Sequence, residues 1–595
     1  MKEPREKFND AVSDQHGAQT IVTGEQAGVQ KARILSNIWT KKAFVLAYST
    51  LLLTIFVNRF QVYTAVVYNA YATSSFSEHS LLSTAGVVSD ITKLCAYPII
   101  AKLGDVFGRA EGFAFSIAFS VVGSILYAAC PNIETYLVAG IFDSIGDIGV
   151  LLTQQVFIAD TTSFINRGFW SAVPESTTGI IAIYAGSLVA DGVLNHSTWR
   201  WGYGMWALIL PVCAIPLISI ILIYENRAKR QYKVGTSVLS DSKNSYAVRV
   251  GRFLWHDLDI LGAILLVAGF SLVLVPISLT GSASTADGWG KPSFIAMIVV
   301  GVVALIAFGV WDGKFAAYPF VPYRLLTNRT VIASCLLGGF DFCSYSIFTM
   351  FFPSYLQVAG GHSPGNASRI NTSLNVAYQI SRILTGILLR FSSRPQIWVY
   401  AGVPLCLLGQ GLMIRFTNMP GGHVANTSSL VAAKVLVGVG RGLYHTASQV
   451  SVQAVVSKQQ VAVATAVFLA WMTVGSAIGQ RQASNTPIGS AIWRHTLPQK
   501  LTLYLPENAK GNATAIYESI VVARKFAHGT PARDAINQSY RELQKLLAII
   551  GTAFLVPMIG LMFCMKSINL KHVTSQEEKG EQVEVEGQGA SKGAN

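Results

Sequence analysis

Apolar residues in this chain are gathered into long blocks that are separated by short polar segments. Examples are residues 43–62, 113–130, 203–224 and 546–564, which carry few charges. A helix of about 20 mostly apolar residues is long enough to cross the hydrocarbon core of a bilayer. Hydropathy predicts fourteen such spans, beginning near residues 43, 81, 112, 135, 170, 203, 257, 292, 331, 368, 396, 428, 461 and 545. We therefore expect an all-α membrane protein with fourteen transmembrane helices.

The charges of the connecting segments predict which side of the membrane they face. Lys and Arg are concentrated in the N-terminal segment, in the loop after the sixth span and in loops of the same parity. Short loops rich in Lys and Arg stay in the cytoplasm, so both termini should be cytoplasmic. The expected parts are a disordered N-terminal tail (1–42), a six-helix bundle (43–224), a cytoplasmic basic loop (225–256), two additional central helices (257–312), a second six-helix bundle (313–565) with a long external loop (495–543), and a disordered C-terminal tail (566–595).

Composition narrows the class of protein further. Only 13% of the residues are charged, about half the fraction of a soluble protein. The basic loops of one membrane face account for the net charge of +14, so we expect no nucleic-acid partner. The seven cysteines form no C-x-x-C pair, and we expect no metal site and no cofactor. The sequence lacks a G-x-x-x-x-G-K-[ST] motif and lacks paired His or Ser–His residues at one membrane face, which argues against ATP drive and against an enzyme.

Potential glycosylation sites give an independent indication of topology. An N-x-[ST] triplet marks an acceptor for N-glycosylation. Triplets in loops predicted to be external begin at Asn195, Asn366, Asn426, Asn512 and Asn537. They support the predicted orientation and indicate a eukaryotic secretory route.

The loop after the second span carries a recognisable motif. Residues 101–109 read A-K-L-G-D-V-F-G-R, which resembles the major facilitator signature G-x-L-x-D-x-x-G-R with an alanine at its first position. Gly104 and Gly108 permit close approach of the helices. Asp105 and Arg109 offer charged contacts that hold one conformation of the two halves. We interpret Asp105, Gly108 and Arg109 as a conformational switch.

Longer stretches indicate a particular branch of the major facilitator superfamily. They lie at residues 71–76, 199–205, 321–324 and 491–498. Together they resemble the fungal siderophore–iron transporters, a fourteen-span branch of that superfamily, over roughly residues 40–570. The resemblance implies proton-coupled import of ferric siderophores by a monomer in lipid, with iron present only as part of the cargo. It implies the plasma membrane, with an endosomal or vacuolar membrane as alternatives. Haem transport, glutathione–proton exchange and drug–proton antiport stay open.

One segment departs from the pattern of that family. Residues 480–486 insert seven polar residues, Arg481 among them, between Gly479 and Pro487. Such residues do not belong in hydrocarbon. They extend a loop, or the gene model has a wrong splice boundary.

Charged residues inside the spans are candidates for function, because a charge at the bilayer centre costs about 3 kcal/mol. Asp143 and Asp147 lie one helical turn apart and share a face. Two carboxylates this close repel each other, which allows one to hold a proton near neutral pH. We interpret them as the proton-coupling site, with Asp341 and Asp90 as further candidates. Cavity carboxylates without this role, and a structural pair of Asp90 with Lys93, are the alternatives.

The second half of the chain carries candidate cavity residues. Arg382 lies in the tenth span, and Arg441 and His445 lie one turn apart in the twelfth. The glycine-rich stretch 437–442 around Arg441 has a weak counterpart in the fourth span, which fits two related halves that face one central site. Aromatic rings and hydrogen-bond donors would hold a neutral ferric hydroxamate more than charge would.

The long external loop contains a predicted helix start. Thr530 followed by Pro531 fits an N-cap and a first turn, so residues 532–547 should form a helix that runs into the last span. In the resembling family a tyrosine of this stretch is linked to substrate uptake, and Tyr540 is the matching position. We interpret Tyr540 as a substrate gate. The alternative is an anchor at the level of the lipid headgroups.

Overall fold

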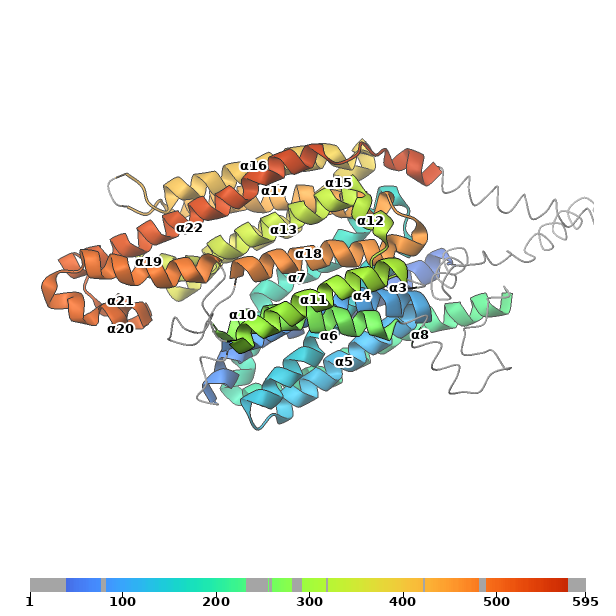
Figure 1. The fold of residues 1–595 in the computed structure, drawn as a ribbon, viewed down its shortest axis with the longest axis horizontal. Coiled ribbons are helices and arrows are strands. Elements are labelled where there is room, and N and C mark those ends of the chain that lie inside the picture. The colour runs from blue at the N-terminus through green and yellow to red at the C-terminus, as the bar shows by residue number, and fades with distance from the viewer. Residues whose placement is uncertain are drawn as a thin grey trace, which may run out of the picture.

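The computed structural model describes residues 39–75, 82–231, 255, 259–280, 292–316, 319–420, 423–480, 488–518 and 520–575. Long helices run roughly side by side along the molecule (Figure 1). Fourteen helices in these ranges have at least 20 residues: α3 (Lys41–Ser75), α4 (Leu82–Phe107), α5 (Arg109–Ala129), α6 (Ile133–Thr161), α7 (Phe164–His196), α8 (Trp199–Gln231), α10 (Ile260–Thr280), α11 (Pro292–Lys314), α13 (Arg329–Thr349), α15 (Pro364–Ser392), α16 (Pro395–Phe416), α17 (Thr427–Ala454), α18 (Val461–Gln480) and α22 (Pro531–Phe563).

These long helices begin close to the predicted spans, which confirms the all-α class. Ten helices of the described residues are long and apolar enough to cross a membrane. Helices α15 and α17 are not among them because they carry many polar residues, several of them buried inside the protein. The count of fourteen crossings stays a prediction.

The helices pack into two halves. Helices α3 to α8 form the N-terminal half, and α13, α15 to α18 and α22 form the C-terminal half. The halves meet where α4 packs against α18 and α7 packs against α15. Helices α10 and α11 pack on each other, and α10 also packs against α4. This arrangement creates an interface between the halves in which side chains from both can meet.

Two predicted loops differ from the structure. Helix α8 continues to Gln231, into the predicted loop 225–256, of which residues 232–254 lie outside the described residues. The predicted external loop 495–543 is largely helical. Its elements are α19 (Ile488–Tyr504), the 3-10 helix η6 (Glu507–Asn512), α20 (Ala513–Glu518), α21 (Ile520–Lys525) and the start of α22. Residues 1–38 of the predicted tail 1–42 and residues 481–486 of the insertion 480–486 lie outside the described residues, whereas Lys41 and Lys42 begin α3.

Residues 566–575, which were predicted to belong to a disordered tail, are ordered in the structure. Ile568 and Leu570 are buried against Phe164 and Leu389. The backbone N–H of Leu570 donates to the carbonyl of Ser393 (2.8 Å). These two apolar residues interrupt an otherwise polar stretch, and their burial holds the chain against the helix ends.

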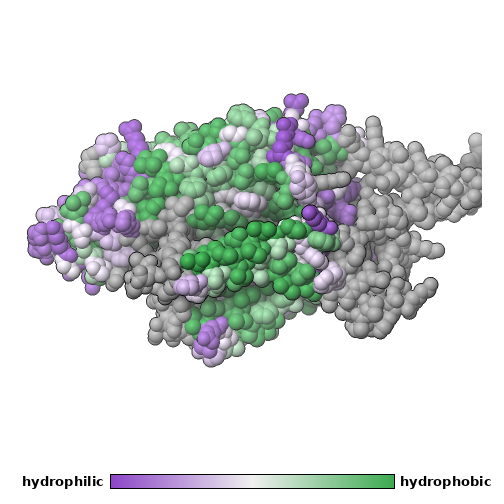
Figure 2. Space-filling model, in the orientation of Figure 1, coloured by the Kyte–Doolittle hydropathy of each residue, from purple (hydrophilic) through white to green (hydrophobic). Residues whose placement is uncertain are grey.

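The outer surface is apolar over a broad band. Figure 2 shows this band across the molecule, with hydrophilic side chains toward its ends. On α11, Val299, Val303 and Ile306 are 54%, 58% and 62% exposed. Soluble monomers rarely expose apolar patches of this extent. The band therefore faces lipid, and the protein is an integral membrane protein.

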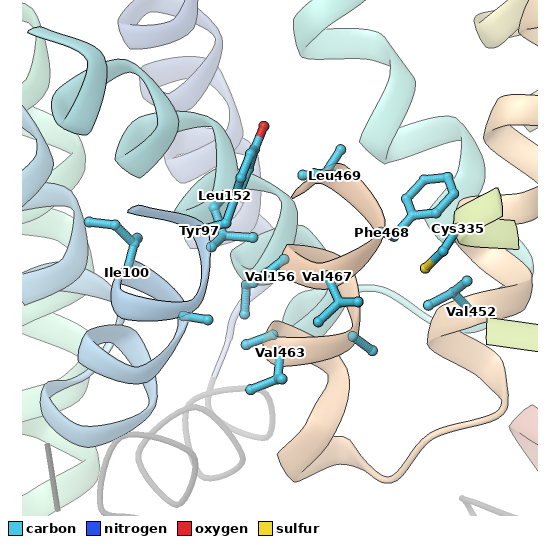
Figure 3. Packing of buried hydrophobic residues seen from close by; sticks show 14 of the residues in the cluster. Tyr97, Ile100, Leu152, Val156, Cys335, Val452, Val463, Val467, Phe468 and Leu469 are labelled. Carbon is cyan, nitrogen blue, oxygen red and sulfur yellow. The ribbon is translucent and has the colours of Figure 1, made fainter. Parts of the chain in front are cut away.

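The contact between α4 and α18 is apolar. Tyr97 and Ile100 of α4 lie on one side of it, and Val463 and Val467 of α18 lie on the other (Figure 3). The cluster also contains Leu152 of α6, Cys335 of α13 and Val452 of α17. Apolar contacts are non-directional, and a hydrogen bond between Tyr97 of α4 and Thr473 of α18 adds a directional contact beside them.

The segment 488–530, here called the α19–α21 segment, packs on the start of α22 through an apolar cluster. Thr530 caps α22 by accepting from the N–H of Arg533 (3.3 Å), with a proline in the first turn, as predicted. The buried Arg533 guanidinium donates to the carbonyls of Ala523 (2.9 Å) and Val358 (2.8 Å). One side chain thus ties α21, α14 (Phe352–Val358) and α22 together.

We expect Arg533→Gln to loosen the α19–α21 segment, because a buried hydrogen bond that loses its donor costs about 1–3 kcal/mol. Limited proteolysis of the purified protein should cut this segment several-fold faster than in the wild type. Arg524→Gln is the matched control, since Arg524 is exposed in the same segment. Equal cleavage rates for the two variants would contradict the assignment.

Candidate functional site

The predicted switch motif forms the turn between α4 and α5. Gly108 separates the two helices with φ 125° and ψ 176°, a conformation that residues with a side chain rarely adopt. The buried Arg109 donates to Asp105 (2.9 Å) and to Asp160 at the end of α6 (2.7 Å). The sequence analysis expected charged contacts of Asp105 and Arg109 without naming their partners, and it missed Asp160, which is about fifty residues away in the chain.

The charged contacts of this motif lie within one half of the protein. Asp105, Arg109 and Asp160 belong to α4, α5 and α6 of the N-terminal half. One turn earlier on α4, Lys102 lies 3.9 Å from Asp259 and 4.1 Å from the ring centre of Phe320. The motif is therefore linked to the segments that flank α10 and α11. Its role in holding the two halves in one conformation stays a prediction.

The predicted proton pair lies on α6. Gln61 of α3 donates to Asp143 (2.9 Å), and Lys93 of α4 interacts electrostatically with the same carboxylate. One carboxylate oxygen of Asp147 is buried and has no hydrogen-bond partner among the described residues. Asp90 is half-buried on α4. An acid with an unsatisfied buried oxygen is a suitable place for a proton.

Glycines bring α6 and α17 close to their neighbours. A Cβ atom on Gly146 of α6 would lie 2.5 Å from the backbone nitrogen of Ser120 on α5. In the C-terminal half, a Cβ on Gly440 of α17 would lie 2.6 Å from the backbone nitrogen of Cys406 on α16. The glycine-rich stretch of α17 and its weaker counterpart in α6, which the sequence indicated, thus permit similar close packing of helices in the two halves.

The predicted cavity residues of the C-terminal half meet in its interior. Arg441 donates to Asp341 (2.6 Å), and both side chains are 3% exposed. The guanidinium also lies 4.3 Å from the ring centre of Tyr345. His445 shares a hydrogen bond with the hydroxyl of Tyr378 (2.6 Å). The charge of Asp341 is therefore balanced by an arginine of the same half.

Arg382 lies where the two halves meet. It donates to Glu175 of α7 (2.5 Å), and Arg59 of α3 lies 3.7 Å from the other carboxylate oxygen. Gln155 of α6 also donates to Glu175 (3.1 Å), and Gln449 of α17 donates to Gln155 (2.9 Å). Side chains from α3, α6 and α15 thus meet at one carboxylate of α7, and α17 is linked to it through Gln155.

The sequence analysis missed Glu175 and Arg59. Both lie inside predicted spans, those beginning near 170 and 43, so the rule that intramembrane charges have a role applies to them. Their pairing was not predictable, because Arg59, Glu175 and Arg382 are far apart in the chain.

Tyr540 is buried in the cluster that joins α22 to the α19–α21 segment. Only 1% of it is exposed, and its ring meets that of Trp493 edge-on at 5.5 Å. In this conformation the ring is covered by protein and is not open to a ligand. A gate role requires the α19–α21 segment to move, and it stays a prediction.

The predicted glycosylation sites differ in accessibility. Four are exposed, namely Asn195, Asn366, Asn426 and Asn512. Asn537 is half-buried on α22, and its side-chain oxygen is buried. Their use stays a prediction.

The described residues contain no group of three or more His, Cys, Asp or Glu side chains that could hold a metal ion. The seven cysteines are free thiols.

Known proteins similar to this chain agree with its architecture. The family model for the Major Facilitator Superfamily matches residues 51–480. The MFS siderochrome iron transporter C of Aspergillus fumigatus is 37% identical over 93% of this chain and 88% of that protein. The siderophore iron transporter mirC of Emericella nidulans is 36% identical over 95% and 91%. The siderophore iron transporter 1 of Schizosaccharomyces pombe is 35% identical over 90% and 84%.

Two helical bundles that lie side by side within a membrane are typical of secondary transporters, which alternate access around a site between the bundles. The family match and the relatives make the class specific. The chain belongs to the Major Facilitator Superfamily and, within it, to the fungal siderophore iron transporters, so it is a transporter and not an enzyme.

We expect Asp105→Asn, Arg109→Ala and Asp160→Asn to slow transport about tenfold while the protein still reaches the membrane, because each leaves a buried charge without its partner. Transport rate per molecule at the membrane is the measurement. Asp534→Asn, at an exposed position of α22, is the matched control. Wild-type rates in all three variants would rule out a role of the motif in the transport cycle.

Proposed function

We propose that this protein imports ferric siderophore complexes through a fungal plasma membrane as a proton-coupled monomer. The observation that carries the proposal is the similarity, over more than nine-tenths of the chain, to proteins named as siderophore iron transporters. Iron enters only as part of the cargo, so the protein needs no metal site of its own.

The geometry supports a coupled carrier. Glu175, Arg382 and Arg59 form a charge cluster between the halves, and the acids Asp143 and Asp147 lie on the neighbouring α6. Protons that bind at such acids change the charge balance of the interface. A change of this kind favours one alignment of the halves over another, which is the requirement for coupling.

Uptake of iron-labelled siderophores by cells that lack their own carriers tests the cargo. Haem, glutathione and a cationic drug are run in parallel as the alternative cargoes. Accumulation of the iron label with at least one siderophore, and of no other cargo, supports the proposal. Uptake of haem or exchange of glutathione without siderophore uptake would replace it.

We expect uptake to collapse with a protonophore and to persist without ATP when the proton gradient is clamped. Asp143→Asn and Asp147→Asn should each weaken the rise of uptake on acidification, because an amide cannot take up the proton. Initial rates measured from neutral to acidic medium check this. Normal pH profiles in both variants would move the proton site elsewhere, with Asp341 and Asp90 next in order.

The gate hypothesis predicts that Tyr540→Ala abolishes uptake at normal surface abundance and that Tyr540→Phe keeps part of it. A packing role predicts a different pattern. Loss of a buried aromatic ring costs about 3–5 kcal/mol, so Tyr540→Ala would then lower the abundance of the protein, and Tyr540→Phe would behave as wild type. Uptake and surface abundance measured together separate the two roles. Tyr504→Ala, on α19 of the same segment, is the control.

A further inference from the structure

Glu175 is the point at which an ion pair crosses between the halves. Its side chain is 10% exposed, and each of its carboxylate oxygens faces a different arginine. Oε2 accepts from Arg382 of the C-terminal half (2.5 Å), and Oε1 lies 3.7 Å from Arg59 of the N-terminal half. The carboxylate is therefore shared unequally between a partner in its own half and one in the opposite half.

We propose that Glu175 is the residue that couples proton binding to the alignment of the halves. When it pairs with Arg382, the ion pair holds α7 against α15. When its carboxylate turns to Arg59 instead, both charges of the pair lie in the N-terminal half and Arg382 is released. The inference rests on the proposed function as a proton-coupled transporter, and it adds the residue that transmits the proton signal.

Asp147 competes with Glu175 for Arg59, and this competition makes the exchange of partners depend on a proton. It interacts electrostatically with Arg59, as Glu175 does, and one of its oxygens is buried without a hydrogen-bond partner among the described residues. While Asp147 is ionised, Arg59 is shared between two acids, and Glu175 stays with Arg382. A proton from the external solution that binds the Asp147 carboxylate leaves Glu175 as the remaining acid near Arg59. The same proton leaves from Asp147 when the cycle is completed.

Other groups in electrostatic reach of the two acids come from several helices. Among the described residues they are Tyr97 of α4, Asp143 of α6, Tyr378 of α15 and, next to Arg382, His445 of α17. Because Arg59 interacts with both Glu175 and Asp147, the choice of partner by Glu175 is sensitive to the charge of Asp147, since electrostatic interactions are strong away from bulk water.

Release of Arg382 would loosen a nearby contact between α7 and α15. Toward the ends of α7 and α15 that are predicted to be cytoplasmic, a Cβ on Gly168 would lie 2.9 Å from the side chain of Leu389. A Cβ on Gly386 would lie 2.5 Å from the Cα of Phe169. The two helices therefore touch at backbone distance here, and their separation opens a path on that side.

The test places a reporter in this contact. Leu389 is fully buried, so Leu389→Cys, in a chain whose seven natural cysteines are replaced by serine or alanine, reports the separation of α7 from α15. The rate of maleimide labelling is measured in inside-out vesicles. Glu175→Gln, Arg382→Gln and Asp147→Asn should each raise this rate about tenfold, because a buried charge pair is broken or weakened. The double variant Glu175→Gln with Arg382→Gln should exceed neither single variant, since both remove one interaction.

Arg59→Gln gives the opposite expectation. Without Arg59, Glu175 has Arg382 as its remaining arginine, so labelling should fall below the wild-type rate and acidification should no longer raise it. A general loss of stability would raise labelling in every variant, so the sign of this result separates a coupling role from a structural one. Where Glu175→Gln does not fold, Glu175→Asp keeps the charge with a shorter reach and should label at an intermediate rate.

Two variants serve as controls. Glu542→Gln breaks a partly buried ion pair with Lys500 inside the C-terminal half, and Glu507→Gln breaks an exposed pair with Lys510. Neither should change labelling of the reporter. Wild-type labelling in Glu175→Gln, or faster labelling in Arg59→Gln, would overturn the inference. Labelling needs no cargo, so a failure of siderophore uptake would leave the coupling role intact, and normal uptake with unchanged labelling would remove the coupling role alone.

Discussion

Hydrocarbon offers no hydrogen-bond partner, so each charge inside this protein must be satisfied by the protein itself. The structure meets this constraint with ion pairs that join helices. They are Arg109 with Asp105 and Asp160, Arg441 with Asp341, and Glu175 with Arg382 and Arg59. Removal of one partner from such a pair leaves a buried charge unpaired, at a cost of about 3–5 kcal/mol. The charges that are candidates for function therefore also hold the helices in place.

Lys434 shows a second way of meeting the same constraint. It is fully buried on α17, and its ammonium group donates to the carbonyl (3.2 Å) and the side-chain oxygen (2.7 Å) of Asn371. It also lies 4.3 Å from the ring centre of Phe352. Two oxygens and the negative face of an aromatic ring thus stabilise this cation. Such a cation stays within one half, whereas the pair of Glu175 with Arg382 crosses between halves and must be exchanged when the halves move.

The sequence was informative about what lies along one helix and less so about what lies between helices. Helix starts, the cap at Thr530 and the contact of Asp105 with Arg109 all follow from residues within a few positions of each other. The ion pairs of Asp160 and Glu175 were missed because their partners come from other helices, and hydropathy says nothing of which faces meet. Tyr540 was placed in the correct helix, but its burial depends on the fold of the α19–α21 segment, which the sequence presented as a loop.

The additional helices α10 and α11 are tied to the same helix as the switch motif. Asp259 has φ 50°, and it accepts from the N–H of Gly262 (3.2 Å) and from the indole of Trp311 (2.8 Å). Its other oxygen lies 3.9 Å from Lys102 on α4. Helix α4 thus carries the switch motif, one side of the apolar contact with α18 and the attachment of α10. Since a packed helix moves as a unit, a shift of α4 against α18 must carry α10 and α11 with it or break the contact of Lys102 with Asp259. The additional pair therefore adds mass and lipid-facing surface to the half that contains α4.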